Sequence, residues 1–287
     1  MILTLLRLLR FSLPCALLFI LHNLSAQPAE PEKQLYNPSE NYLYNDAALV
    51  HTFDYFDSLY YGLRPFRIAH IGDSHVKSGF YAESFASLMD SLIKRKINPA
   101  LLLDSAYKMV DLLVIAKNGA MAKTILESVF DDTAMLYFNP DLTIISLGTN
   151  EAYNNLGMDT LAGNNEALIR RVMRTAPNSD ILITTPGDSQ KRYYTKVRIS
   201  KKKRRYRTIT NYTKNNYLPS VVDYYANLPE KMQVAVWNFY NVMGKEGAIM
   251  NWIDSGLAQP DRVHLNRQGY RLQARLLFDA LDKTLEK

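Results

Sequence analysis

From residue 66 onward, short apolar runs alternate with longer stretches whose apolar residues recur at helical spacing. Strands that are apolar along their whole length and alternate with amphipathic helices are typical of a parallel sheet covered on both faces. The pattern therefore predicts an α/β fold, a three-layer α/β/α sandwich with a parallel sheet of about five strands. The predicted strands are Phe66–Ile71, Leu112–Ala116, Leu142–Leu147, Ile181–Thr185 and Val234–Asn238. The predicted helices are Asp46–Tyr61, Tyr81–Ile97, Ala120–Phe130, Asn165–Thr175, Pro219–Asn227 and Arg267–Leu285.

The first 26 residues have the pattern of a secretory signal peptide. Two arginines precede an apolar run, residues 11–24, and Ala26 follows at a position suited to cleavage. The alternative is an uncleaved membrane anchor, which is less favoured because the run is short for a bilayer span and contains Pro14 and Asn23. We therefore expect a protein that is exported to the periplasm or secreted, with cleavage after Ala26.

The remaining chain predicts a linker at residues 27–45, which are polar and rich in proline, and one domain at residues 46–287. Cys15 is the only cysteine and lies in the predicted signal peptide, so the mature chain can form no disulfide and cannot use a cysteine nucleophile. The net charge of +6 favours anionic envelope polymers or membrane surfaces as partners of an exported protein, rather than nucleic acid.

Glycine, aspartate and serine follow the first predicted strand directly. Gly72 allows a sharp turn, which places Ser74 at the end of the strand and near the start of the next helix. There the Ser74 N–H can bind a negatively charged oxygen. These residue types are also common in turns and helix caps, so the motif alone does not define a nucleophile.

Two other strand ends carry groups that can donate hydrogen bonds to an oxyanion. Gly119 follows the second strand, and its lack of a Cβ lets a substrate oxygen approach the backbone N–H. Asn150 follows the third strand and can donate from its side-chain amide. Both are also ordinary turn residues.

Asp261 and His264 precede the last predicted helix and can activate a serine. A serine hydroxyl is a weak nucleophile and needs a base, and His264 can accept its proton near neutral pH. Asp261 can hold the other ring nitrogen. A single Asp-x-x-His sequence is common by chance, so its meaning depends on the combination with Ser74.

The other histidines give little support for a metal centre. His51, His70 and His75 do not form the helical spacing of a zinc site with one another or with His264. His70 lies in an apolar strand and is expected in the core, and His75 is expected to be structural rather than to line the site. A glycine-rich phosphate loop is absent from the sequence, and we expect neither a metal nor a cofactor.

Taken in order, these motifs resemble the SGNH (GDSL-type) hydrolase superfamily. The resemblance spans residues 66–287 and implies a flavodoxin-like sandwich with Ser74, Asp261 and His264 as the catalytic triad. It also implies an oxyanion hole made by Ser74, Gly119 and Asn150. Two positions depart from the family pattern: His75 replaces the common leucine, and Glu151 replaces the usual aspartate. We expect the Glu151 side chain to support its loop. The matching motifs are Gly72-Asp73-Ser74, Gly119, Gly148-Thr149-Asn150 and Asp261-Arg262-Val263-His264.

The histidine after Ser74, the export signal and the segment Gly256–Leu265 resemble peptidoglycan O-acetylesterases of this superfamily. This resemblance implies an exported serine carboxylic-ester hydrolase that removes acetyl groups from a cell-envelope polysaccharide. Three alternatives stay open: an acetylesterase that acts on another glycan, a lysophospholipase-like lipid esterase, and a non-catalytic wall-binding protein with the same fold.

The segment Lys191–Arg207 is strongly basic, with ten Lys or Arg residues, and no Asp or Glu occurs from Ser189 to Val222. The simplest interpretation is a solvated loop. Interleaved tyrosines are typical of nucleic-acid-binding segments, but export makes that partner unsuitable. Because the segment follows the strand Ile181–Thr185, it leaves the sheet from the same edge as Ser74. A second hypothesis is therefore that it holds an anionic envelope polymer or a membrane surface beside the nucleophile.

We predict that the mature protein begins at Gln27 or within a few residues of it, because small residues precede this position after the apolar run. The measurement is N-terminal sequencing of the protein isolated from an envelope fraction. Recovery of intact Met1 would contradict the prediction.

Overall fold

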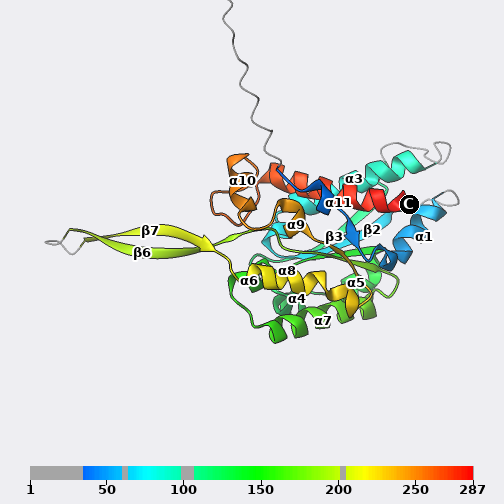
Figure 1. The fold of residues 1–287 in the computed structure, drawn as a ribbon. Helices are drawn as coiled ribbons and strands as arrows, with labels where there is room; N and C mark the ends of the chain where they lie inside the picture. Colours follow the sequence, from blue (N-terminus) through cyan, green and yellow to red (C-terminus); the bar gives the residue numbers. More distant parts are fainter. Residues whose placement is uncertain (1–34, 60–63, 98–106, 201–204, 287) are drawn as a thin grey trace, which may run out of the picture. The chain divides into compact units, whose positions relative to one another are not determined.

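The computed structural model describes residues 35–59, 64–97, 107–200 and 205–286 (Figure 1). Its main sheet has the strand order β1-β8-β5-β4-β2-β3. The strands are β1 (Leu43–Tyr44), β2 (Phe66–Gly72), β3 (Val110–Ala116), β4 (Leu142–Ser146), β5 (Asp180–Thr184) and β8 (Ala235–Trp237). All pairs among the last five are parallel, and β1 is an antiparallel edge strand. The predicted sheet of about five parallel strands in flavodoxin-like order is confirmed.

Alternate residues of the central strands enter two separate cores. In β2, Phe66 and Ile68 join one hydrophobic cluster, while Ala69 and Ile71 join the other. A strand whose two faces are both buried must be apolar throughout, which explains the near-continuous runs in the sequence. The first cluster lies under α1 (Val50–Ser58), α3 (Phe80–Lys96), α9 (Phe239–Met243), α10 (Ala248–Asp254) and α11 (Arg267–Leu285). The second lies under α4 (Ala122–Ser128), α5 (Asp132–Phe138), α7 (Met158–Thr175) and α8 (Leu218–Ala226) (Figure 1).

No helix in the described part of the chain combines the length and the apolarity needed to cross a bilayer. Residues 1–26, the predicted signal peptide, lie outside the described residues, as do residues 27–34 of the predicted linker.

The chain joins the domain before residue 46, earlier than the predicted boundary of the linker. Leu43 is buried, and β1 pairs with β8. The Asn41 side chain accepts a hydrogen bond from the indole N–H of Trp237 (2.9 Å) and donates one to the carbonyl of Leu276 (3.0 Å). Residues 41–44 are therefore attached both to the sheet and to α11.

The basic segment forms a β-hairpin rather than a loop, and most of its described residues are exposed, as expected of a solvated segment. The strands β6 (Gln190–Ser200) and β7 (Arg205–Lys214) pair antiparallel, with Arg192 opposite Tyr212 and Arg198 opposite Tyr206. Figure 1 shows the hairpin extending well beyond the helices and the main sheet. Lys201, Lys202, Lys203 and Arg204, which belong to the predicted basic segment, lie outside the described residues.

Candidate active site

Ser74, His264 and Asp261 form a continuous hydrogen-bonded chain. Ser74 Oγ lies 3.0 Å from His264 Nε2, and His264 Nδ1 lies 2.7 Å from Asp261 Oδ2. Asp261 Oδ1 also accepts hydrogen bonds from the backbone N–H groups of Val263 and His264. The fold thus brings together the three residues predicted as a triad, at distances suited to proton transfer. Ser74 and His264 are 190 positions apart in the sequence.

The pKa shifts of Asp261 and His264 make His264 a stronger base toward Ser74. Burial alone would raise the pKa of Asp261, but hydrogen bonds from His264 and Val263 outweigh it and lower the pKa to about 2. The hydrogen bond to Asp261 raises the pKa of His264 above its ordinary value, and the negative charge of Asp261 adds to this shift. Asp261 therefore stays ionised and strengthens His264 as a base.

The local structure around Ser74 depends on close packing at Gly72. Gly72 is the last residue of β2, and a Cβ there would overlap the Val76 side chain and lie 2.9 Å from the carbonyl oxygen of Ser146. Its role is close approach rather than the sharp turn expected from the sequence. Asp73 then caps the short helix α2 (Ser74–Lys77) by accepting a hydrogen bond from the His75 N–H (2.9 Å), which fixes Ser74 at the first helical position.

The three triad residues line one cleft of about 410 Å³ together with Gly119 and Asn150. Gly119 has a φ of 71°, and the space where a Cβ would stand is open. The Asn150 amide donates to Asp73 Oδ2 and to the carbonyl of Ala120, both at 3.0 Å. Both amide hydrogens are therefore engaged, so donation to a substrate oxygen requires that one of these bonds be exchanged.

Glu151 ties the second and third motifs together. It is fully buried, and its carboxylate accepts hydrogen bonds from the N–H groups of Ala122 (2.9 Å) and Gly148 (3.0 Å). Burial raises the pKa of Glu151 to about 7, and the nearby Asp73 carboxyl adds to the shift. The expected support of the loop by Glu151 is confirmed, since one side chain connects the start of α4 to the start of α6 (Thr149–Tyr153).

His75 is partly buried beside the catalytic base, with its Nε2 atom inaccessible to solvent. Its ring stacks on His264 with centroids 5.1 Å apart, and its Nδ1 lies 3.0 Å from the Tyr270 hydroxyl. Burial lowers the pKa of His75 to about 3, so the ring is neutral at physiological pH. The expected structural role of His75 is thus only part of its role, because its ring also packs against the ring of the catalytic base His264. His70 is a core residue as expected, with its Nε2 2.9 Å from Ser146 Oγ.

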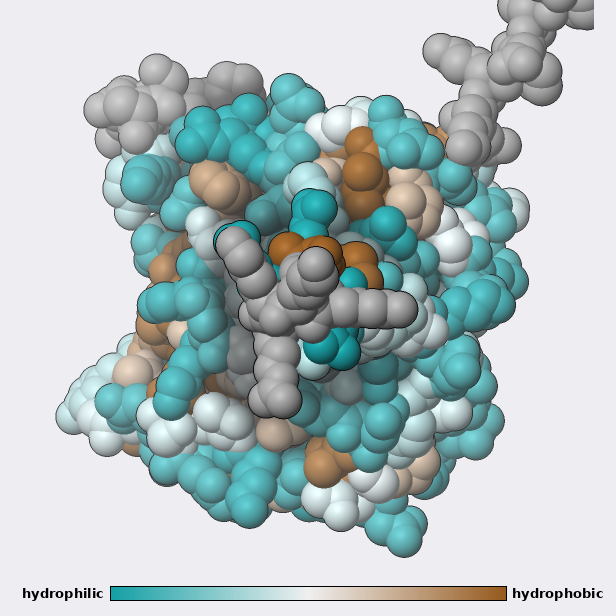
Figure 2. All heavy atoms as spheres, turned by 90° about the vertical axis from the view of Figure 1, so that its left-hand side faces the viewer, coloured by the Kyte–Doolittle hydropathy of each residue, from teal (hydrophilic) through white to brown (hydrophobic). Residues whose placement is uncertain are grey.

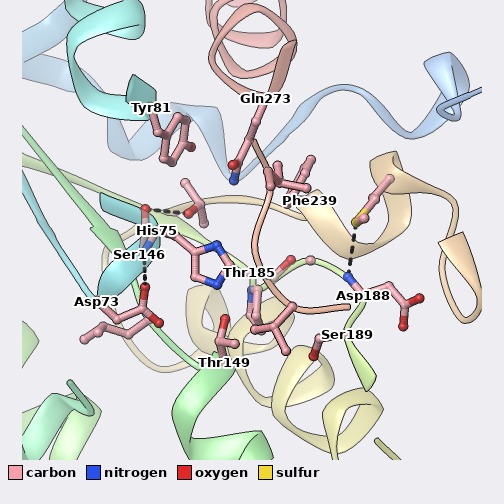
Figure 3. A pocket seen from close by; sticks show the side chains of 17 residues that line it. Asp73, His75, Tyr81, Ser146, Thr149, Thr185, Asp188, Ser189, Phe239 and Gln273 are labelled. Atoms are coloured by element: carbon pink, nitrogen blue, oxygen red, sulfur yellow. Dashed lines mark hydrogen bonds between the residues drawn. The ribbon is translucent and has the colours of Figure 1, made fainter. Parts of the chain in front are cut away.

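A second cavity, of about 30 Å³, lies next to the nucleophile helix (Figure 3). His75 points into it, and Gln273 and Thr149 also line it. The atoms His75 Nε2, Gln273 Oε1 and Ser189 Oγ are buried without a hydrogen-bond partner among the described protein atoms. A polar cavity of this size accommodates one or two water molecules. Within the described residues, no group of three or more His, Cys, Asp or Glu side chains is arranged to hold a metal ion.

Two further residues on the wall of the active-site cleft were not predicted individually. Tyr153, from α6, and Arg192, from β6, line the cleft beside Ser74 and His264. The Tyr153 hydroxyl accepts a hydrogen bond from the Arg192 N–H (3.2 Å). The position of the basic segment after the fourth predicted strand was the signal that could have indicated Arg192.

A hydrogen-bonded chain from serine through histidine to aspartate, at the strand ends of a flavodoxin-like sandwich, is typical of a serine hydrolase. The family model described as "GDSL-like Lipase/Acylhydrolase" matches residues 68–277, so the chain belongs to this family and to the SGNH hydrolase superfamily. The family and the fold define an esterase or acylhydrolase.

Solved structures resemble this chain at low sequence identity. A peptidoglycan O-acetylesterase has a TM-score of 0.67 and 17% identity, covering 85% of this chain and 99% of that chain. A psychrotrophic esterase, EstA from Pseudoalteromonas sp., has a TM-score of 0.48 and 15% identity, covering 77% of this chain and 99% of that one. No curated protein matches the sequence.

We predict that Glu151→Ala lowers the free energy of unfolding by about 2–4 kcal/mol, because two buried N–H groups lose their acceptor. Glu151→Gln, which keeps one acceptor oxygen, should have an intermediate effect. Urea unfolding followed by circular dichroism measures the change. Glu127→Ala, at a largely exposed glutamate of α4, is the control and should be neutral. Equal stability of the Glu151→Ala and Glu127→Ala proteins would contradict the role of the bridge.

Proposed function

We propose that this protein is an exported serine esterase that removes acetyl groups from a cell-envelope polysaccharide such as O-acetylated peptidoglycan. The observation that carries the proposal is the hydrogen-bonded chain from Ser74 through His264 to Asp261, in a cleft that also presents the Gly119 backbone. Export is supported by the signal-peptide pattern of residues 1–26.

The first half of the reaction acylates Ser74. His264 Nε2 takes the proton of Ser74 Oγ while Oγ forms a bond to the ester carbonyl carbon. The carbonyl oxygen becomes an oxyanion, which accepts hydrogen bonds from the N–H groups of Ser74 and Gly119 and from the Asn150 amide. Exchange of an Asn150 bond from Asp73 to the oxyanion makes this contact specific to the charged intermediate. His264 then gives its proton to the leaving sugar oxygen as the C–O bond breaks.

The second half restores the enzyme. His264 takes a proton from a water molecule as the water oxygen attacks the acetyl carbon on Ser74. Collapse of this intermediate breaks the bond to Ser74 Oγ, which regains its proton from His264, and acetic acid leaves. Asp261 remains ionised throughout and stabilises the imidazolium in both halves.

The lining of the cleft supports a small acyl group on a polar substrate. Of the described residues that line it, Val263 alone has an aliphatic side chain, whereas the others are polar, charged, glycine or tyrosine. Binding of a fatty acyl chain needs a predominantly apolar wall. A cleft that opens to solvent and has a single aliphatic side chain in its lining offers no continuous aliphatic wall for a fatty chain, so it suits an acetyl ester on a sugar better than a lysophospholipid.

The similar fold of a peptidoglycan O-acetylesterase supports the same class of substrate. At 17% identity, this likeness concerns the fold. The assignment of an acetyl ester on a wall sugar therefore rests on the lining of the cleft.

We predict that the purified mature chain releases acetate from O-acetylated peptidoglycan faster than from acetylated xylan, and that it does not hydrolyse lysophospholipid. Ser74→Ala should abolish release and the turnover of p-nitrophenyl acetate without lowering the melting temperature. Preference for xylan or for lysophospholipid would move the substrate to one of those classes. Inactivity of the unmodified protein on all esters would indicate a binding protein that kept the fold.

We predict that the acid limb of kcat/KM for p-nitrophenyl acetate lies above pH 6.5. Neutral His264 is the active form, and the hydrogen bond to Asp261 raises its pKa above the ordinary value of about 6.5, so activity is lost as the pH falls through this raised pKa. Asp261→Asn removes the negative charge. It should shift the limb to lower pH and reduce kcat by roughly 10⁴-fold. Asp254→Asn, at an exposed aspartate, is the control. An unmoved limb in Asp261→Asn would show that another group controls it.

A further inference from the structure

The β6–β7 hairpin has two faces of different chemistry. Side chains alternate between the faces of a strand, and directly paired residues share a face. One face, here called the Tyr/Arg face, carries Arg192, Tyr194, Lys196, Arg198, Tyr206, Tyr212 and Lys214. The opposite face carries Lys191, Tyr193, Thr195, Val197, Arg207, Ile209 and Asn211. The guanidinium of Arg192 over the Tyr194 ring and the hydrogen bond from Asn211 to Thr195 agree with this division.

The Tyr/Arg face is continuous with the active-site cleft. Arg192, the first arginine on this face, lines the same cleft as Ser74 and His264. Tyr194 and Tyr206 lie further out and are 59% and 56% exposed, so their rings are available to a ligand. At about 3.3 Å per residue, the 11 residues of β6 extend roughly 35 Å, far beyond the reach of a single ester group.

The base of the hairpin is fixed to the loop that carries Asp261 and His264. Arg262, between Asp261 and His264, stacks on Tyr212 with its guanidinium carbon 4.1 Å from the ring centroid. It also donates to the Gln190 side chain (2.8 Å), and its carbonyl accepts from the Gln190 N–H (2.9 Å). The Tyr153 hydroxyl, from α6, accepts a hydrogen bond from the Arg192 N–H (3.2 Å). A ligand on the hairpin is therefore held in a fixed direction from Ser74.

The side chains of the Tyr/Arg face suit a polymer of sugars that carries negative charge. A tyrosine ring offers an apolar surface for the C–H face of a sugar and a hydroxyl for its polar edge. Arginine binds carboxylate or phosphate groups with two parallel hydrogen bonds, and lysine adds a point charge. The sequence contains no Asp or Glu from Ser189 to Val222, and Lys214, at the base of this face, forms an ion pair with Glu246.

We propose that the Tyr/Arg face binds an acidic polysaccharide chain and presents its esterified sugars to Ser74. The proposal rests on the proposed function and names the polymeric, anionic character of the substrate. A bilayer is the less suitable partner, because the aliphatic residues Val197 and Ile209 stand on the opposite face, away from the side that enters the cleft. Figure 2 shows the side of the molecule from which the hairpin extends, where hydrophilic residues predominate.

The test compares matched variants of the two faces in the inactive Ser74→Ala protein. Tyr194→Ser, Lys196→Ser and Tyr206→Ser together remove one charge and two rings from the Tyr/Arg face. Tyr193→Ser, Arg207→Ser and Ile209→Ser remove one charge, one ring and one aliphatic side chain from the opposite face. Binding is measured by sedimentation with peptidoglycan from which the O-acetyl groups have been removed by base, and with phosphatidylglycerol/phosphatidylcholine vesicles. Melting temperatures verify that each variant is folded.

We expect the Tyr/Arg-face variant to raise the dissociation constant for peptidoglycan roughly tenfold, and the opposite-face variant to leave it nearly unchanged. Binding of the parent should weaken as salt rises, because the attraction between exposed charges is screened. Equal loss in both variants, no loss in either, or binding to vesicles in place of peptidoglycan would each overturn the proposal. Because the probe lacks acetyl groups, failure of acetate release together with retained binding would reject the proposed ester and leave the binding face in place.

Discussion

The parallel register of β2 with its two neighbours places the nucleophile and the oxyanion donors of the active site. Gly72 stands opposite Ala116 of β3 on one side and Ser146 of β4 on the other, so the three strands end at the same level. The loops that follow them therefore leave the sheet side by side and bring Ser74, Gly119 and Asn150 to one cleft. His264 is added from the far end of the chain, just before α11, which packs against α3.

This arrangement requires polar groups in places where burial is costly. Asp73 and Glu151 are both buried, and burial raises the pKa of each to about 7. Each carboxyl group is compensated by hydrogen bonds from the segments it must position: Asp73 by the His75 N–H and the Asn150 amide, Glu151 by two backbone N–H groups. These hydrogen bonds hold the loops beside the cleft in place, because displacement of either loop would leave a buried acid or N–H group without its partner.

The sequence predicted those parts of the molecule whose physical cause is local. The strands were recognisable because both faces are buried, and the triad because Ser74, Asp261 and His264 lie in motifs at strand and loop ends. The hairpin was missed as a hairpin because both of its faces meet solvent. Tyrosines and charged residues occur on both faces, so no alternation of apolar and polar residues marks its strands. The attachment of residues 41–44 depends on the Asn41 side chain, whose partners Trp237 and Leu276 are 196 and 235 residues away in the chain. The stacking of His75 on His264 is equally non-local.

The pairing of β6 with β7 restricts how the hairpin can change in length during evolution. Addition or removal of two residues in each strand beyond Arg192 leaves every remaining side chain on its original face. A change of one residue turns all the more distant side chains to the other face, which separates the tyrosines from the cleft. Homologous hairpins that retain the same ligand are thus constrained to differ in length by even steps, whereas an odd step exchanges the chemistry presented beside the active site.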